Sequence, residues 1–222
     1  MIILPKTKDG RPITSYSQCE KFHSETGFTI NYSPGMYEYF QKYFLGLDLP
    51  YNPVWADFGN KVEDAIEKKD FTGFTDEETA HLKTIKPLEV FQQNLVVDFG
   101  EFLVTLYIDN CTKDMSVLHD FKTCSDNSIK KYHKDSYKQL ELYSLCIKKH
   151  TGKMPKKAAV LPIMRKGNPF RGETLEVAGV GDFIEREINK KVLDETEQWL
   201  RSTVEQISEY YQVYQKVRSH ES

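Results

Sequence analysis

Three charged residues occupy two apolar runs in the middle of the sequence. Asp109 ends one β-type run, and Asp120 and Lys122 interrupt the next, with one residue between them. Side chains alternate between the two faces of a strand, so Asp120 and Lys122 point the same way while Phe121 points to the opposite layer. If the two runs form a hairpin, Asp109 lies across from that pair.

Two carboxylates and an ammonium group are thereby concentrated where a sheet normally carries Val or Ile. Two carboxylates about 4 Å apart repel each other by about 4 kcal/mol at an effective dielectric constant of 20. A bound cation offsets that cost, and oxygen ligands without His or Cys nearby favour a hard ion, Mg²⁺ or Mn²⁺. The pattern predicts a metal site, with a structural ion pair on an edge strand as the alternative.

The elements that must position these residues follow from the hydrophobic periodicity. Two runs, 90–97 and 102–108, are separated by Asp98–Glu101 and predict a hairpin. A third run over 115–121 makes an antiparallel meander of residues 90–123. An amphipathic helix is expected next, from about 127 to 150, ending at Gly152. The chain should close with a strand over 158–164 paired with 174–180, and a long helix over about 183–217.

The spacing of apolar residues in the N-terminal part of the sequence predicts helices. Within 13–50 we expect a short helix running through Phe22 and a second over about 36–44, and Pro53 opens a third that reaches Ile66. Thr75 and Glu78 form a capping-box signature for one more short helix. The whole order predicts an α/β (α+β) fold: one domain over 1–222, with a core at about 55–180 and a central mixed sheet flanked by helices.

Composition narrows the class of protein. The chain has 222 residues, 39% of them hydrophobic, and a formal net charge of −3, which argues against a sequence-independent basic coat for nucleic acid. No window approaches the roughly 18–20 apolar residues of a membrane span, and no signal segment is recognised, so we expect a soluble cytoplasmic protein, in host cytoplasm if viral. The four cysteines form no C-x-x-C pair, and we expect neither a zinc module nor an iron–sulfur cluster.

The charged core, read with its flanking motifs, resembles the PD-(D/E)XK nuclease superfamily. Asp109, followed after a short gap by Asp120-Phe121-Lys122-Thr123, is similar to the core of its RecB-type exonuclease branch. Three further stretches resemble motifs of that branch, in the same order: Ser15-Tyr16-Ser17, the helix segment Gly59–Glu63, and Gln139-x-x-x-Tyr143. Glu63 stands where the branch normally has His. The resemblance covers about residues 13–150 and implies a restriction-endonuclease-like core.

The resemblance also implies a mechanism and a set of site residues. Glu63, Asp109 and Asp120, with the Phe121 carbonyl, would hold one or two Mg²⁺ or Mn²⁺ ions that activate water and stabilise the scissile phosphate. Lys122 would orient the water or stabilise the developing charge. Gln139 and Tyr143 would support the site or contact the backbone of the DNA. Further contacts to DNA phosphates are expected from Ser15, Ser17, Lys130, Lys131, Lys134 and Lys138.

The function predicted from the sequence is therefore a Mg²⁺/Mn²⁺-dependent deoxyribonuclease, most simply an exonuclease of recombination, repair or viral DNA processing. A structure-selective endonuclease or resolvase on the same core is one alternative, and an inactive nuclease-like binding module is another. The partners expected are DNA, a recombination or replication protein and, through the seven-residue spacing of Leu193, Leu200, Ile207 and Tyr214, a second copy of the chain.

Overall fold

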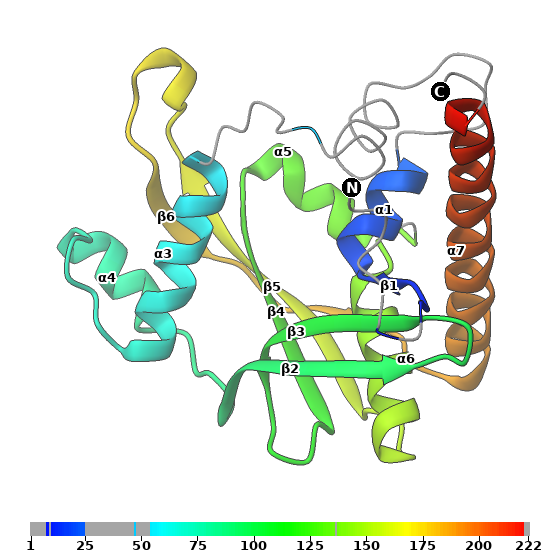
Figure 1. Cartoon of the computed structure of the whole chain (residues 1–222). Coiled ribbons are helices and arrows are strands. Elements are labelled where there is room, and N and C mark those ends of the chain that lie inside the picture. The colour runs from blue at the N-terminus through cyan, green and yellow to red at the C-terminus, as the bar shows by residue number, and fades with distance from the viewer. Residues whose placement is uncertain (1–7, 9, 25–46, 48–53, 136, 220–222) are drawn as a thin grey trace. The chain divides into compact units, whose positions relative to one another are not determined.

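The computed structural model describes residues 8, 10–24, 47, 54–135 and 137–219, and Figure 1 shows their arrangement. The helix expected over 36–44 lies outside these residues. The strands are β1 (Ile13–Thr14), β2 (Val90–Asp98), β3 (Leu103–Cys111), β4 (Val117–Cys124), β5 (Lys157–Lys166), β6 (Glu176–Val180) and β7 (Ile184–Arg186). The α-helices are α1 (Tyr16–Ser24), α3 (Val54–Lys68), α4 (Asp76–Leu82), α5 (Asp126–Ile129), α6 (Gln139–Thr151) and α7 (Lys190–Ser219).

The described strands form one mixed sheet of seven, in the order β1-β3-β4-β5-β6, with β2 beside β3 and β7 beside β5. β3 and β4 are antiparallel, whereas β4 and β5 run parallel over the whole of β4, and β6 and β7 are both antiparallel to β5. The predicted sequence of strand pairs, β2 with β3, β3 with β4 and β5 with β6, is confirmed. So is the α/β class, a central mixed sheet flanked by helices.

The chain divides into two compact units. One takes in Tyr51–Asn94 and Tyr107–Asn189, and the other Met1–Pro50, Leu95–Leu106 and Lys190–Ser222. All of the charged core residues singled out above belong to the first unit. The single domain over 1–222 stays a prediction.

In the first unit, α3 and α4 cover the face of the sheet to which Phe121 points. Phe58, Val62 and Ile66 recur along α3 at helical spacing, and all three are buried against Phe121 in one hydrophobic cluster. The predicted capping box of α4 is present: the Glu78 amide donates to the Thr75 side chain and the Thr75 amide donates to the Glu78 carboxylate. The alternation in β4 therefore works as expected, with an aromatic side chain in the core and charged neighbours on the other face.

The helix predicted over 127–150 is wrong in its first half. The chain forms the short α5, then a 3₁₀ helix over Lys130–His133, and begins α6 only at Gln139. The reason is a buried arginine from β7. Arg186 donates to the backbone carbonyls of Tyr132, Lys134 and Tyr137, and binds the Glu141 carboxylate at 2.6 Å. Lys134 is extended, with φ −85° and ψ 144°, so no helix continues through it, and the Arg186 contacts stabilise the segment in this conformation.

The predicted start of the C-terminal helix is also corrected. Ile184–Arg186 is the strand β7, which pairs with β5, and α7 begins at Lys190. In the second unit α7 packs against α1. Leu193, Leu200 and Ile207 are fully buried within the single chain, so three positions of the seven-residue stripe serve core packing. A second copy bound through this helix stays a prediction.

No helix in the described ranges combines the length and hydrophobicity that a membrane crossing requires.

Candidate active site

The geometry of β3 and β4 brings the three charged core residues together. The register Asn110↔His119 places Asp109 and Asp120 at the next position of the antiparallel pair. Lys122 extends its ammonium group between them, 2.7 Å from Asp120 Oδ1 and 3.7 Å from Asp109 Oδ2. The Phe121 amide fixes the second carboxylate by donating to Asp109 Oδ2 at 2.9 Å. The prediction that these side chains share one face is confirmed.

A hydrogen-bond network from the start of α6 holds Asp120. Gln139 Nε2 donates to Asp120 Oδ1 at 2.6 Å and also lies 2.9 Å from the Tyr143 hydroxyl, one helical turn further on. The Tyr137 hydroxyl lies 3.2 Å from Asp120 Oδ2 and 2.7 Å from Gln139 Oε1. Asp120 is only 1% exposed, yet both of its carboxylate oxygens have donors. Its orientation is therefore fixed before any ligand arrives.

Burial makes the charges of this cluster costly. It raises the pKa of Asp120 to about 7, with the Asp109 carboxylate adding to the rise and Lys122 opposing it. For Lys122 burial opposes the charged form, but the Asp120 and Asp109 carboxylates outweigh it and raise its pKa above the ordinary value. Burial beside Asp120 likewise raises the pKa of the Tyr143 hydroxyl. Near neutral pH, the site thus combines a charged lysine with a buried Asp120 carboxyl group whose ionisation is costly.

Glu63 on α3 completes the acidic group. Burial, with the charges of Asp109 and Asp120 adding to its effect, raises the pKa of Glu63 to about 8, so the three carboxyl groups are near enough to affect one another. Gln92 Nε2 donates to Glu63 Oε2 at 3.4 Å. Gln92 has a φ of 48°, a left-handed conformation that side chains other than Gly seldom adopt. Strained backbone is therefore present beside the carboxylate.

The cluster suits a hard divalent cation in its chemistry. In the described part of the chain no three His, Cys, Asp or Glu side chains are close enough to hold an ion as they stand. However, the nearby carboxyl groups of Glu63, Asp109 and Asp120 supply only oxygen ligands. The raised pKa values of Glu63 and Asp120 mark an excess of negative charge that Lys122 offsets in part. The donor set thus fits Mg²⁺ or Mn²⁺.

The remaining residues predicted from the sequence divide by location. The Phe121 carbonyl accepts a bond from Lys122 Nζ at 3.3 Å, so it faces the cluster as expected. Ser15 immediately precedes α1 and Ser17 lies in its first turn, with 3.2 Å between the two hydroxyl oxygens; both belong to the other compact unit. The four lysines lie in the segment where the predicted helix is broken, with Lys138 half-buried and the others exposed: Lys130, Lys131, Lys134 and Lys138.

Three residues near the site were not predicted. Tyr137 precedes the Gln-x-x-x-Tyr pair by two positions, and nothing in its spacing marks it. Gln92 lies in an ordinary alternating strand pattern, and its unusual φ is visible only in the structure. Arg186 contacts this segment across about fifty positions of sequence, which no local pattern reports.

Comparison with known proteins finds similar structures but no similar sequence. No model of a protein family and no curated protein matches the sequence. A proposed exonuclease of Eubacterium rectale is 12% identical with a TM-score of 0.56, over 89% of this chain and 80% of the other. A phage-related exonuclease of Haemophilus somnus 129PT is 12% identical with a TM-score of 0.54, over 92% and 95%. An alkaline exonuclease of Laribacter hongkongensis, also 12% identical, gives 0.50 over 99% and 96%.

The chain has the fold of these exonucleases. Identity of this size establishes shared architecture and leaves activity to be argued from the residues of the site.

Proposed function

We propose that the protein is a divalent-metal-dependent deoxyribonuclease, and specifically an exonuclease. One observation carries the proposal: the Lys122 ammonium lies between two carboxylates, 2.7 Å from the buried Asp120 and 3.7 Å from the half-buried Asp109. A fold rarely keeps such a group inside a sheet for stability alone, because burying charges costs more than hydrophobic packing at the same positions. The exonuclease fold supports the same proposal.

Asp109, Asp120 and Glu63 would hold Mg²⁺ or Mn²⁺, with the Phe121 carbonyl as a further oxygen ligand. The bound ion supplies a lowered pKa for water and stabilisation of charge on the phosphate oxygens. Part of the cost of ionising Glu63 and Asp120, whose pKa values burial raises, is then met by the ion. Iron–sulfur chemistry has no part in this proposal.

The other residues have roles that follow from their contacts. Lys122 binds a phosphate oxygen of the substrate and stabilises the charge that grows on it, and it remains protonated because the carboxylates raise its pKa. Gln139 and Tyr137 are positioning residues, since both bond Asp120. Tyr143 supports Gln139 through its hydroxyl.

The wider proposal concerns DNA and the setting of the reaction. The exposed lysines of the segment before α6 bind phosphates without reading sequence, as expected for an enzyme that degrades any sequence. Ser15 and Ser17 are proposed as further DNA contacts, in keeping with the RecB-type motif. We propose a cytoplasmic role in recombination, repair or viral DNA processing, with a recombination or replication protein as a partner.

The test is cleavage of linear and circular DNA with Mg²⁺, Mn²⁺ or EDTA, by the wild type, Asp120→Asn and Lys122→Met. We expect metal-dependent degradation of linear DNA alone, with a loss of about a hundredfold or more in Lys122→Met. Asp57→Asn is the matched control, because Asp57 is an exposed acid on the same helix as Glu63. Cutting of circles would establish an endonuclease instead. An inert wild type under every metal would leave only a binding module.

A further inference from the structure

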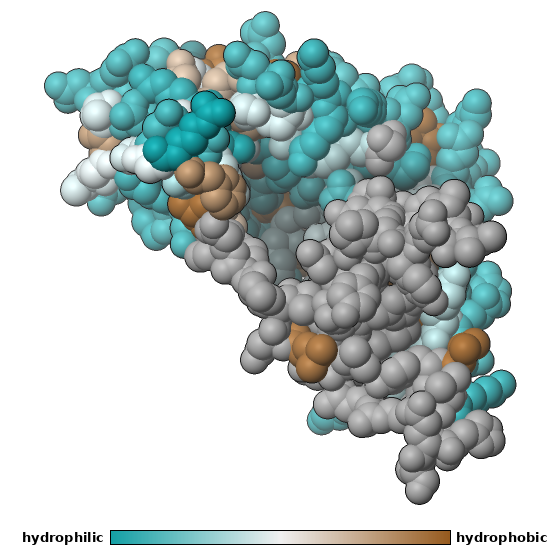
Figure 2. Space-filling view, turned by 90° about the horizontal axis from the view of Figure 1, so that it is seen from above, coloured by the Kyte–Doolittle hydropathy of each residue, from teal (hydrophilic) through white to brown (hydrophobic). Residues whose placement is uncertain are grey.

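The arm formed by β5 and β6 ends in an exposed aromatic side chain. The two strands are antiparallel, and a 3₁₀ helix over Pro169–Arg171 forms the turn between them. Phe170 in this turn is 72% exposed, more than any other large hydrophobic side chain in the described residues. In the space-filling view, hydrophilic residues make up most of the coloured surface (Figure 2). A single exposed ring is ordinary by itself, and what distinguishes Phe170 is what lies beside it.

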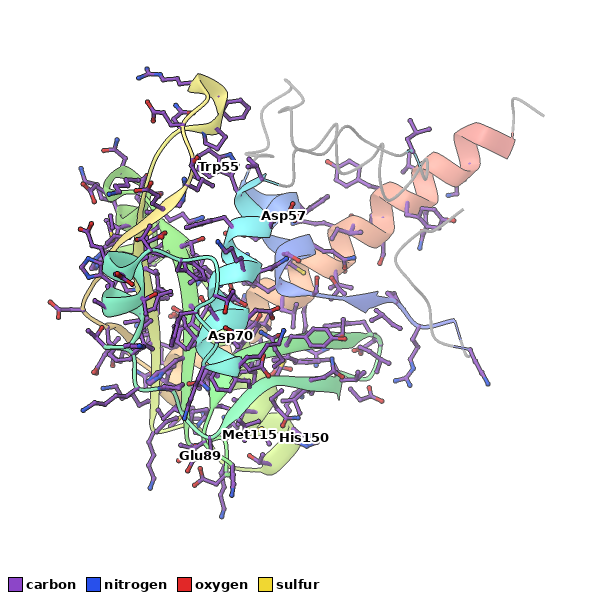
Figure 3. All side chains as sticks on the ribbon, turned by 90° about the vertical axis from the view of Figure 1, so that its left-hand side faces the viewer. Trp55, Asp57, Asp70, Glu89, Met115 and His150 are labelled. Atoms are coloured by element: carbon purple, nitrogen blue, oxygen red, sulfur yellow. The ribbon has the colours of Figure 1, made fainter. Side chains whose placement is uncertain are left out.

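Behind Phe170 lies a second aromatic ring with an arginine on it. Trp55, in the first turn of α3, has its ring centroid 6.3 Å from that of Phe170, and the Arg165 guanidinium lies 3.8 Å from the Trp55 centroid. Figure 3 shows Trp55 between α3 and the arm. A guanidinium group at this distance over the indole ring is attracted by the negative face of the ring, which favours its place beside Trp55.

Arg165 and Arg171 differ from three other arginines of the described residues in what they bind. Arg11, Arg186 and Arg201 each pair with a carboxylate of the chain. Across the described ranges, neither Arg165 nor Arg171 forms an ion pair with a carboxylate. Two guanidinium groups are thus left for an external anion beside an exposed ring.

The turn that presents Phe170 is fixed by local geometry. The Phe170 amide donates to Asn168 Oδ1 at 3.0 Å, and Gly172 has a φ of 75°, as a residue that ends such a turn requires. Gly167 has a φ of 92°, and a Cβ there would come within 2.0 Å of the Thr174 carbonyl oxygen. Because the turn is closed in this way, little conformational entropy is lost when the ring takes part in binding.

Residue counts along α3 and along β5 both place Trp55 and Arg165 a short distance from the charged site around Lys122. Trp55 precedes Glu63 by eight positions on α3, about 12 Å at about 1.5 Å per residue. In β5, Pro162 pairs with Lys122, and Arg165 is three residues further on, about 10 Å along the strand. A stacked DNA strand advances about 3.4 Å per nucleotide, so the cluster lies about three nucleotides from the charged site.

We propose that Phe170, backed by Trp55 and Arg165, is a stacking platform for an unpaired base of the substrate DNA, and that Arg165 and Arg171 bind the adjoining phosphates. Stacking on an aromatic ring tolerates any base, which suits a strand of any sequence. The placement three nucleotides from the cut rests on the proposed nuclease function, whereas the platform itself does not. With such a platform, the expected substrate is a DNA end that carries a single-stranded stretch.

The experiment measures binding in EDTA, where no cleavage occurs. A labelled single-stranded oligo(dT) and a labelled blunt hairpin duplex are titrated with the wild type, Phe170→Ala and Phe170→Tyr, and dissociation constants are read from fluorescence anisotropy. Phe170→Ala should weaken single-strand binding about tenfold, the loss of one stacking contact. Phe170→Tyr should restore it, and blunt duplex should change less than about twofold. Met154→Ala is the control, an exposed apolar side chain on another loop.

A second readout reports on the ring directly. Trp55 and Trp199 are the only two tryptophans of the sequence, so Trp199→Phe leaves Trp55 as the sole reporter. Single-stranded DNA should quench its emission, and Phe170→Ala should reduce the quenching. The platform is overturned if Phe170→Ala binds the single strand as tightly as wild type, or loses single strand and blunt duplex equally. In either case, DNA cleavage that Asp120→Asn abolishes would leave the nuclease proposal intact. Single-strand binding that depends on Phe170, without cleavage under any metal, would support the platform and overturn the nuclease proposal.

Discussion

Replacing Glu63 with Gln should stabilise the metal-free protein at neutral pH. The pKa of Glu63 is raised from an ordinary 4.5 to about 8, chiefly by burial and next by the Asp109 charge. A raised folded pKa means that the folded state binds the proton more tightly than the unfolded chain. The contribution of Glu63 to the stability of the wild type is therefore fully present below about pH 4.5 and is lost as the pH rises toward 8.

The magnitude follows from the two pKa values. From the ordinary 4.5 up to pH 7.5 is about three units, and each unit is worth about 1.36 kcal/mol, so the ionisable group costs up to about 4 kcal/mol at that pH. Gln has nearly the same shape, carries no charge and still accepts the bond from Gln92. Glu63→Gln should thus raise the free energy of unfolding by an amount approaching this value at pH 7.5 and change it little at pH 4.

The assay is urea unfolding of both proteins in EDTA at pH 4 and pH 7.5. The matched control is Asp64→Asn, the next residue on α3, whose carboxylate pairs with Lys68 at 2.7 Å with both side chains 62% exposed. Loss of such an exposed pair is worth only about 0.3–0.5 kcal/mol. The reasoning is refuted if Glu63→Gln is no more stable than wild type at pH 7.5, or if its gain is the same at both pH values.

Three further outcomes are expected. Arg186→Met should lower the free energy of unfolding by about 3–5 kcal/mol, because the Glu141 carboxylate stays buried without its partner, and adding Glu141→Gln should recover part of the loss in the same urea assay. Tyr137→Phe should cost about 1 kcal/mol and slow cleavage in single-turnover kinetics, since its hydroxyl orients Asp120, and an unchanged rate would remove that role. Burial raises the pKa of the Cys19 thiol to about 12, and all four cysteines are buried. A thiol reagent at pH 8 should therefore label none of them quickly in the folded protein and all four in urea. Rapid labelling of the native protein would contradict this expectation.

The parts of the fold that were predicted correctly depend on local signals. The strand alternation around Phe121 and the reciprocal cap of Thr75 and Glu78 are encoded within a few residues, and both are present. The spacing of Gln139 and Tyr143 likewise survives as one helical turn that joins their side chains. These patterns act over one turn or one strand, which is the range that periodicity reports.

The parts that were not predicted depend on contacts far apart in the sequence. The segment before α6 is stabilised in its non-helical form by contacts with Arg186. The late start of α7 exists because Ile184–Arg186 pairs with β5. Neither contact leaves a trace in the helical periodicity of the segment it changes. Tyr137 enters the site through the same break, so its role depended on the tertiary contact as well.

Calorimetric titration of Mn²⁺ into the protein tests the central claim most directly, because it asks whether the carboxyl groups around Lys122 hold a cation. The account predicts binding to wild type and to Asp57→Asn, with proton release near pH 7, and loss of binding in Asp109→Asn. Equal binding by Asp109→Asn and wild type, or no binding by wild type, would contradict it.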